Sequence, residues 1–207
     1  PEEIYWLISN FVNGSIPKYQ MSAWLMAINF KGMDLNEIAI YTNELIKSGN
    51  RIQFENDGRK VIDKHSTGGV GDKVSLILAP LLAATNFRIP MLAGRSLEHT
   101  GGTIDKLESI PGFNLQFSLD QFKLNVNQIG LGIMMQTNDI CPADGKIYAL
   151  RDVTATVASL PLICGSIMSK KIAEGIQTLV LDIKTGNGAF TDSIEKSQEL
   201  GELMKNI

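Results

Sequence analysis

The most informative part of this sequence is the run Val61-Ile62-Asp63-Lys64-His65-Ser66-Thr67-Gly68-Gly69-Val70-Gly71-Asp72-Lys73-Val74-Ser75. Its start has the apolar character of a short strand, its middle is rich in glycine, and the stretch 74–84 that follows is helical in character. A glycine-rich loop between a strand and a helix lets backbone N–H groups approach an anion at the positive end of the helix dipole. We therefore predict an anion site here, with a plain strand-to-helix turn as the alternative.

This loop differs from two common nucleotide-binding loops. Asp72 separates Gly71 from Lys73, which excludes the Gly-Lys-Ser/Thr ending of a Walker A loop. The glycine spacing also fails the GxGxxG pattern of dinucleotide-binding folds. The side chains that the loop and the following helix offer an anion are Lys64, Ser66 and Ser75.

Further apolar runs of strand length alternate with helical stretches along the chain. They lie at 89–93, 129–135 and 179–183, and Asp192-Ser193-Ile194-Glu195 predicts a capping box that opens the last helix. Such alternation favours an α/β domain with a mainly parallel sheet. Gly186-Asn187-Gly188 is interpreted as a turn between the last strand and that helix.

The first fifty residues have a different pattern. Apolar residues recur there at helical spacing in three segments, which close at Gly14, Gly32 and Gly49. Residues 152–175 also read as helix, with Pro161 kinking or dividing it. We therefore expect a small discontinuous helical domain (1–50 and 141–175) and an α/β domain (51–140 and 176–207).

Composition sets the broad class of the protein. The chain has 207 residues, 44% hydrophobic and 20% charged, with a formal net charge of -3, which is typical of globular proteins and disfavours nucleic-acid binding. No apolar run has membrane-spanning length, and the start lacks the pattern of a signal peptide. Cys141 and Cys164 form no CxxC pair and are interpreted as reduced thiols, so we expect a cytoplasmic protein. The missing initial Met and the helical pattern at the last residues suggest cuts at both ends and an incomplete sheet.

A second glycine-rich loop, residues 94–103, also follows a strand and precedes a helical stretch. Two such loops in one sheet can hold a single anion from two sides. Each contains a histidine, and a loop histidine beside an anion is a candidate general acid. His65 is weakly favoured over His99, and simple hydrogen bonding to backbone is the alternative for both.

Other polar residues are less telling from the residues alone. Ser166 and Lys170 are spaced i, i+4 and share a helix face, for which a solvated face is the default interpretation. Asp105 and Glu108 are expected to be carboxylates beside a helix N-terminus.

The two loops, taken with longer motifs, resemble the thymidine phosphorylase and pyrimidine-nucleoside phosphorylase family. The resemblance covers nearly the whole chain and rests on residues 63–72 and 94–108, Pro111-Gly112-Phe113, Pro142-Ala143-Asp144, Arg151-Asp152-Val153-Thr154-Ala155-Thr156-Val157 and Lys170-Lys171-Ile172-Ala173-Glu174-Gly175. It implies a helical domain and an α/β domain, a homodimer joined through the helical domains, and a chain about half the family's length.

The resemblance also implies roles for individual residues. Phosphate would be held by Lys64, Ser66, Ser75 and Thr103. The pyrimidine edge would be held by Arg151, Ser166 and Lys170, with His65 beside it and Val157, Ile167 and Phe190 around the base. His65, Arg151 and Lys170 would form the catalytic set.

The chain departs from the family pattern at three positions in the second loop. Ala93 stands where the family usually has a phosphate-binding serine, a loss of about 0.5–1.5 kcal/mol if that bond is ordinary. Ser96 and Glu98 each replace a usual glycine. The Ser96 hydroxyl is a candidate replacement for the missing serine, whereas the Glu98 carboxylate repels phosphate if it points inward. Some relatives bind a monovalent cation near Gly71, and Lys73 is a candidate substitute for it here.

The implied reaction is reversible phosphorolysis of a pyrimidine nucleoside by orthophosphate to free base and pentose 1-phosphate, with no metal or organic cofactor. Met91 stands where the resemblance places a residue that helps to select the sugar, and it favours 2′-deoxynucleosides over uridine unless it is simply a core residue. The alternatives are a broad-specificity uridine/thymidine phosphorylase and an anthranilate-type phosphoribosyltransferase, whose Mg²⁺ would need Asp105 and Glu108. A non-catalytic binding or dimerisation module is the alternative if the chain is naturally this short.

Overall fold

The computed structural model describes residues 1–95 and 100–207 of the chain. These residues divide into two compact units. The helical unit consists of residues 1–51, 137–173 and 198–207, and the sheet unit consists of residues 52–136 and 174–197. The expected combination of a discontinuous helical part with an α/β part is confirmed, and the domain boundaries expected from the sequence stay a prediction.

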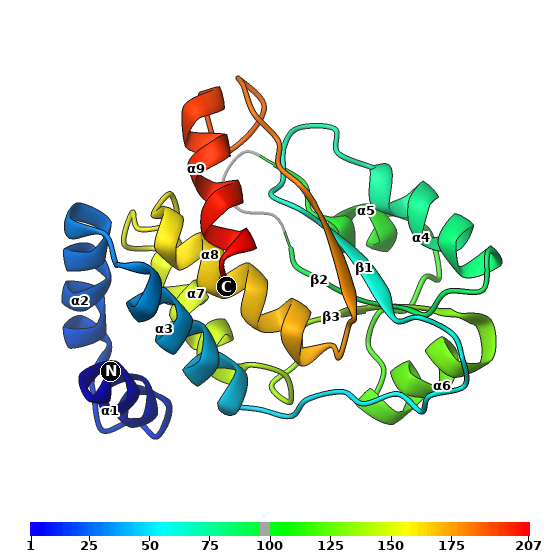
Figure 1. The fold of residues 1–207 in the computed structure, drawn as a ribbon, viewed down its shortest axis with the longest axis horizontal. Coiled ribbons are helices and arrows are strands. Elements are labelled where there is room, and N and C mark those ends of the chain that lie inside the picture. Colours follow the sequence, from blue (N-terminus) through cyan, green and yellow to red (C-terminus); the bar gives the residue numbers. More distant parts are fainter. Residues whose placement is uncertain (96–99) are drawn as a thin grey trace. The chain divides into compact units, whose positions relative to one another are not determined.

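The helical unit has two groups of helices from distant parts of the chain (Figure 1). They are α1 (Glu2–Val12), α2 (Lys18–Lys31), α3 (Leu35–Lys47), α7 (Pro142–Asp152) and α8 (Leu160–Ala173), to which the second half of α9 (Ile194–Lys205) is added. Gly32 ends α2 with φ 73°, a conformation that favours glycine. Asp34 and Glu37 then form a capping box that begins α3, with Glu37 N donating to Asp34 Oδ1 at 2.8 Å.

The core of this unit depends on close packing between α3 and α8. A Cβ on Gly165 would lie 2.5 Å from the ring of Tyr41, so only glycine lets the two helices approach this closely. The buried apolar side chains of the unit include Ile8, Met21, Leu25, Tyr41, Leu45, Ile147 and Leu162. Their burial fixes α7 and α8 against the N-terminal helices.

The expected helix over residues 152–175 is only partly correct. Residues 153–159 are turns and irregular backbone, and Ala155 has φ 55°. The helix α8 begins at Leu160, which places Pro161 in its first turn, where the missing N–H of proline is tolerated. The stretch is therefore divided and not kinked: α7 ends at Asp152, and Pro161 lies in the first turn of the separate helix α8.

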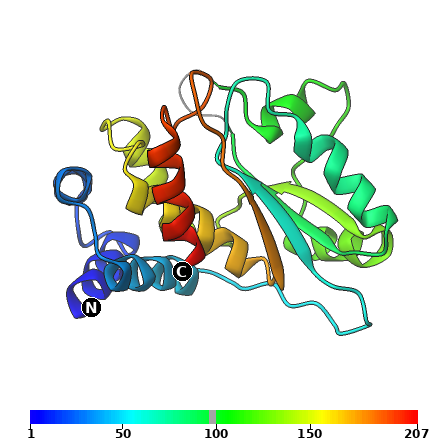
Figure 2. The same ribbon diagram turned by 45° about the horizontal axis from the view of Figure 1, so that its top comes forward.

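The sheet unit contains four parallel strands in its described part. They are β1 (Ile62–Ser66), β2 (Ile89–Ala93), β3 (Leu131–Met135) and β4 (Thr178–Asp182). Strand β1 pairs with β4, and β2 pairs with β3 (Figures 1 and 2). A parallel bridge between Val61 and Arg88 joins the two ladders at their starts, which gives the spatial order β4-β1-β2-β3.

Helices cover both faces of β2 and β3. Ile89, Met91 and Ile133 pack with Ala79 of α4 (Val74–Ala84). On the other face, Gly132 lies against α6 (Leu119–Ile129). A Cβ added to Gly132 would lie 2.8 Å from the ring of Phe122. This double cover explains why the strands are apolar runs, as is usual for parallel sheets.

Two local expectations need correction. The third strand begins at Leu131, because α6 continues to Ile129 and Gly130 ends it with φ 77°. The expected capping box makes Asp192 the residue that caps the last helix. The cap is one residue later: α9 begins at Ile194, and Ser193 Oγ accepts from Lys196 N at 3.3 Å. Neither change alters the order of the elements.

A membrane-crossing helix, judged by length and apolar character, is not found among residues 1–95 and 100–207.

Candidate functional site

Three loops gather at one edge of the sheet. Strand β1 lies between β4 and β2, parallel to both, and the three strands end at Ser66, Asp182 and Ala93. The first glycine-rich loop follows β1, the second follows β2, and residues 183–190 follow β4. The carboxyl ends of parallel strands are where ligands bind in open α/β sheets.

The loop after β4 supports the first glycine-rich loop. Val70 N donates to Gly188 O at 2.7 Å, and a bridge joins Gly69 to Ala189. A Cβ on Gly69 would lie 2.9 Å from Gly188 O, so the two backbones approach too closely for a side chain. The ring of Phe190 lies against Gly68. The segment 186–190 is therefore part of this loop cluster as well as a strand-to-helix turn.

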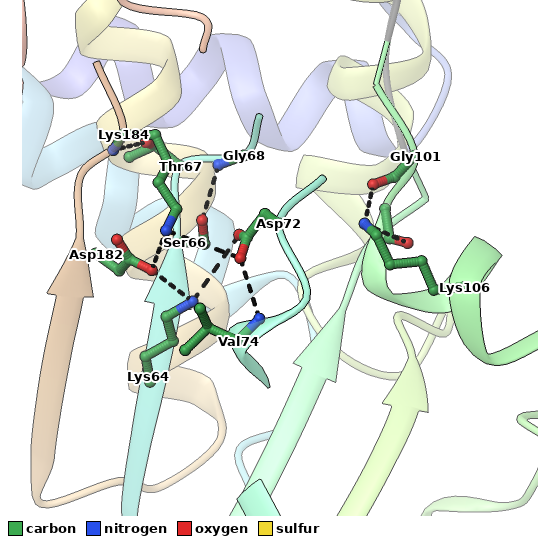
Figure 3. A network of polar contacts seen from close by, with 11 residues as sticks. Lys64, Ser66, Thr67, Gly68, Asp72, Val74, Gly101, Lys106, Asp182 and Lys184 are labelled. Atoms are coloured by element: carbon green, nitrogen blue, oxygen red, sulfur yellow. Dashed lines mark hydrogen bonds and ion pairs between the residues drawn. The ribbon is translucent and has the colours of Figure 1, made fainter. Parts of the chain in front are cut away.

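Lys64 lies at the centre of this cluster and is held by carboxylates (Figure 3). Its side chain is 4% exposed, and its Nζ lies 2.8 Å from Asp182 Oδ2 and 4.0 Å from Asp72 Oδ2. Ser66 Oγ accepts from Gly68 N at 3.2 Å and hydrogen bonds to Asp72. Two of the side chains expected to bind phosphate are thus already engaged by aspartates.

A second lysine shares the same aspartates. Lys184 Nζ lies 2.8 Å from Asp182 Oδ2 and 3.8 Å from Asp72 Oδ1 (Figure 3). Partial burial acts to raise the pKa of Asp182, but the hydrogen bonds from Lys184 and Lys64 outweigh it, so the pKa lies below its usual value. The hydrogen bond to Asp182 raises the pKa of Lys184.

Sequence reasoning missed Asp182 and Lys184. The available signal was position: Asp182 ends a strand of the parallel sheet, at the edge where ligand-binding residues collect. Lys73, considered as a substitute for a monovalent cation, is exposed, and the lysines that reach Asp72 are Lys64 and Lys184.

The remaining expected phosphate residues lie at helix starts. Ser75 is buried in the first turn of α4, and Thr103 is the half-buried first residue of α5 (Thr103–Glu108). Ala93 is the last residue of β2, so the usual hydroxyl is absent at that strand end. The expectations for Ser96, Glu98 and His99 lie outside the described residues.

Two further residues of the sheet unit have defined positions. His65 lies on β1 opposite Leu181 of β4 and is half-buried. Met91 is 4% exposed and packs with Ala79 and Ile89, which is the core-residue alternative raised by the sequence. Its role in sugar selection stays a prediction.

The carboxylate pair that a phosphoribosyltransferase would need for Mg²⁺ is engaged elsewhere. Arg95 NH1 lies 3.1 Å from Asp105 Oδ1 and 2.7 Å from Glu108 Oε2. Asp105 Oδ2 also accepts from Gly102 N at 2.9 Å, as expected for a carboxylate at a helix N-terminus. The arginine hydrogen bonds hold the pKa of Glu108 below its usual value. This contact disfavours the metal-binding alternative.

In the helical unit, Arg151 binds backbone. Arg151 is only 1% exposed. Its guanidinium donates hydrogen bonds to the carbonyl oxygens of Thr156 at 3.2 Å, Leu162 at 3.1 Å and Val157 at 2.6 Å. Burial lowers the pKa of Arg151. These bonds fix the irregular segment between α7 and α8.

Lys170 and Ser166 face each other on α8, as their spacing predicts, but the expected solvated face is wrong: Ser166 is 4% exposed and the Lys170 side chain 14%. Lys170 Nζ donates to Ser166 Oγ at 2.9 Å and to Asp144 Oδ2 at 2.5 Å. Asp144 on α7 is 1% exposed, and its Oδ1 has no hydrogen-bond partner within the described structure. The ring of Tyr148 lies 5.9 Å from Lys170 Nζ.

The expected base-binding residues are thus divided between the two units. Arg151, Ser166, Lys170 and the buried Val157 and Ile167 belong to the helical unit, and His65 and Phe190 belong to the sheet unit. Asp144 and Tyr148 were missed. They precede Arg151 by seven and three residues, the spacing of one helix face, which was the available signal.

Comparison with known proteins places this geometry in context. Residues 58–206 match the family model described as the glycosyl transferase family, a/b domain, and residues 1–49 match that of the helical bundle domain. The chain is 47% identical over 207 residues to a thymidine phosphorylase of Agrobacterium fabrum, covering 100% of this chain and 47% of the relative. It is 49% identical over 206 residues to the human thymidine phosphorylase, covering 99% of this chain and 43% of the relative.

A pyrimidine-nucleoside phosphorylase of Geobacillus stearothermophilus is 48% identical over 206 residues, covering 100% of this chain and 48% of the relative. The chain therefore spans about half the length of the curated relatives it matches. Among solved structures, an anthranilate phosphoribosyltransferase from Thermus thermophilus superimposes with a TM-score of 0.74 at 18% identity, covering 99% of this chain and 58% of that one. That likeness concerns the fold. The family resemblance of the motifs is confirmed by the relatives.

Proposed function

This chain belongs to the glycosyl transferase family that combines a helical bundle domain with an a/b domain, and from that premise we propose that the whole protein catalyses reversible phosphorolysis of pyrimidine nucleosides. The observation that carries the proposal is the cluster at the ends of β1 and β4, where Lys64 and Ser66 begin the first glycine-rich loop and lie beside Asp72 and Asp182. The names of the relatives agree with it, since they include thymidine and pyrimidine-nucleoside phosphorylases.

Phosphate binds, in this proposal, at the carboxyl edge of the sheet. The residues that hold it are Lys64, Ser66, Ser75 and Thr103. Lys64 supplies charge, the hydroxyls supply donors, and the first turn of α4 supplies a positive dipole end. The absence of a hydroxyl at Ala93 makes Lys64 correspondingly more important.

The pyrimidine binds to residues of α7, α8 and the segment between them. Lys170 and Ser166 offer polar groups on one helix face, and Arg151 fixes the backbone there and adds positive charge. The family resemblance adds His65 to this set. Val157, Ile167 and Phe190 supply apolar contacts around the base.

The reaction follows from these charges. The glycosidic C1′–N1 bond breaks with its electron pair leaving on the base, while a phosphate oxygen forms the new bond to C1′. Lys170 and Arg151 stabilise the negative charge that develops on the base, and His65 donates a hydrogen bond or a proton to it. Bound phosphate is both the nucleophile and the counter-charge for the sugar cation.

We further propose that 2′-deoxynucleosides are preferred. The proposal rests on the position of Met91, which the family resemblance links to sugar selection: a thioether there offers a ribose 2′-hydroxyl no good hydrogen-bond partner. The test is kcat/KM for deoxyuridine and for uridine with orthophosphate, measured on the complete natural protein. Equal values or a preference for uridine would assign the protein to the broad-specificity pyrimidine phosphorylases.

The proposed homodimer forms through the helical domain. In the helical unit a groove is lined by Trp6, Leu7, Trp24, Ile28 and Met33, and Trp6 is exposed at its rim. Large exposed aromatic side chains around such a groove are typical of protein interfaces. Trp6→Glu should lower the sedimentation mass of the complete protein from dimer to monomer; an unchanged dimer would place the interface elsewhere. The expected cytoplasmic location stays a prediction, with which two free buried cysteines agree.

A further inference from the structure

In the proposed phosphate site, two groups that would bind phosphate are already bound to aspartates. Lys64 Nζ is 2.8 Å from Asp182 Oδ2, and Ser66 hydrogen bonds to Asp72. A phosphate dianion must draw both groups away from these carboxylates before they can bind it. If nothing replaced them, two partly buried aspartates would be left without compensation beside a second anion, which is costly.

We propose that Lys184 is a positioning residue of the phosphate site, which compensates Asp182 and Asp72 and thereby releases Lys64 and Ser66 to phosphate. This inference rests on the proposed function, because it concerns the affinity of the same site for orthophosphate. It assigns a role to a residue outside the four expected to bind phosphate.

The geometry of Lys184 suits this role without rearrangement (Figure 3). Its Nζ lies 2.8 Å from the same Asp182 oxygen that Lys64 contacts, and 3.8 Å from the other oxygen of Asp72. The backbone of Lys184 is fixed on both sides. Its N–H donates to Thr67 Oγ1 at 2.9 Å, and its carbonyl accepts from Thr191 Oγ1 at 2.5 Å. The ammonium is therefore already in place when Lys64 turns to phosphate.

Charge balance gives the same answer. Two lysines and two aspartates make the cluster neutral, whereas without Lys184 it carries one net negative charge. That charge both repels phosphate and strengthens the hold of the aspartates on Lys64. The Lys184 side chain is 30% exposed, so solvent moderates the effect.

The experiment measures KM for orthophosphate and KM for deoxyuridine in the complete natural protein and its Lys184→Met variant. We expect the phosphate KM to rise roughly two- to fivefold, with the nucleoside KM unchanged, since one partly exposed charge pair is lost. Lys196→Met is the matched control. Lys196 pairs with Asp192 in an exposed i, i+4 contact in the same unit, and its loss should leave both constants unchanged.

A second substitution separates release of Lys64 from general attraction of anions. In Lys184→Met/Asp182→Asn the competing carboxylate is gone, so the phosphate KM should return toward that of the parent protein. A double variant that binds phosphate as weakly as Lys184→Met, or more weakly, would overturn the inference. If Lys184→Met does not fold, Asp182→Asn alone decides the matter: we expect an equal or lower phosphate KM, and a rise overturns the inference.

Lys64→Ala, measured in parallel, distinguishes this inference from the function on which it rests. A raised phosphate KM in Lys64→Ala with none in Lys184→Met overturns only the role of Lys184. If neither variant changes phosphate binding, the proposed anion site is itself wrong, and the inference falls with it.

Discussion

Lys64 and Lys170 are both largely buried lysines held by an aspartate, but the two contacts differ in kind. Lys170 binds Asp144, a residue 1% exposed, at 2.5 Å, and has Ser166 as a second partner on its own helix. Lys64 shares Asp182 with Lys184, and Asp182 is 27% exposed in its side chain. Asp144 is thus paired with one lysine, Lys170, whereas Asp182 is paired with two lysines, Lys64 and Lys184, which can replace each other.

This difference matches the needs of the two proposed subsites. A charge that stabilises a leaving base acts best when it is fixed before the reaction begins. A charge that receives a diffusing phosphate must be able to change partners. The helical unit therefore supplies a lysine held in one position, and the sheet unit supplies two lysines that share the same aspartate.

The strongest test of this comparison is the stability of Lys170→Met against that of Lys64→Met. Lys170→Met leaves Asp144 buried without its cation, which should cost about 3–5 kcal/mol of unfolding free energy. Lys64→Met leaves Asp182 with Lys184 and should cost about half as much or less. Urea unfolding of the complete protein measures both.

A rescue variant controls this first prediction. Asp144→Asn in the Lys170→Met background removes the uncompensated charge and should recover part of the lost stability. If the two lysine variants are equally stable, the distinction between fixed and shared contacts is wrong.

The second test concerns Arg151, the other rigid charge. Arg151→Lys keeps the positive charge but cannot donate to three carbonyl oxygens in a fixed plane, so we expect a loss of about 2–3 kcal/mol. Arg51→Lys, at an exposed position of the same unit, is the control. Unchanged stability of Arg151→Lys with lost activity would instead indicate that Arg151 acts mainly by direct contact with the base.

Local signals in the sequence were enough for most of the fold. The helix 74–84 and the strand 89–93 match α4 and β2 in their bounds, because each is an apolar run between clear breaks. Helix α6 was missed, and its last residue was assigned to a strand. Its apolar residues Leu119, Phe122, Val126 and Ile129 recur at helical spacing between the Ser118 cap and Gly130, so the signal was present in the sequence and was overlooked.

The site was predictable in its residue types and less so in its contacts. The glycine-rich loops and Lys64 follow from strand-loop-helix order, which is local. The pairing of Lys64 with Asp182 joins strands more than a hundred residues apart, and no local pattern reports it. Likewise, no local pattern around Arg151 reports the backbone carbonyls that bind its guanidinium in the turn after α7.

The third test asks whether the sheet-unit loops depend on close backbone packing. Gly69→Ala places a methyl group 2.9 Å from Gly188 O, and the two loops must separate, at a cost of about 1–3 kcal/mol. Gly94→Ala is the matched control for the thermal unfolding only, because open space surrounds the added Cβ but the residue belongs to the second glycine-rich loop. Thermal unfolding and the phosphate KM should both change in Gly69→Ala; a change in neither would show that the loops are not coupled.

The smallest expected effect is the pH dependence of the stability that Asp182 contributes through its contacts with Lys64 and Lys184. Partial burial acts to raise the pKa values of Asp182 and Asp72, but their hydrogen bonds and nearby lysines outweigh it, so both pKa values lie below the unfolded value of about 3.9. A depressed carboxyl pKa contributes stability that is fully present above the unfolded pKa and is lost as pH falls through the folded pKa. Because the pairs are partly exposed and shared, that contribution should be under about 1 kcal/mol. Asp182→Asn should therefore be slightly less stable than the parent protein at pH 7, and the difference should disappear as the pH falls below about 4. Asp120→Asn, at an exposed position on α6, is the control. A difference that stays constant with pH would mean that Asp182 contributes through packing and neutral hydrogen bonds, and that its charge is not what holds the two lysines together.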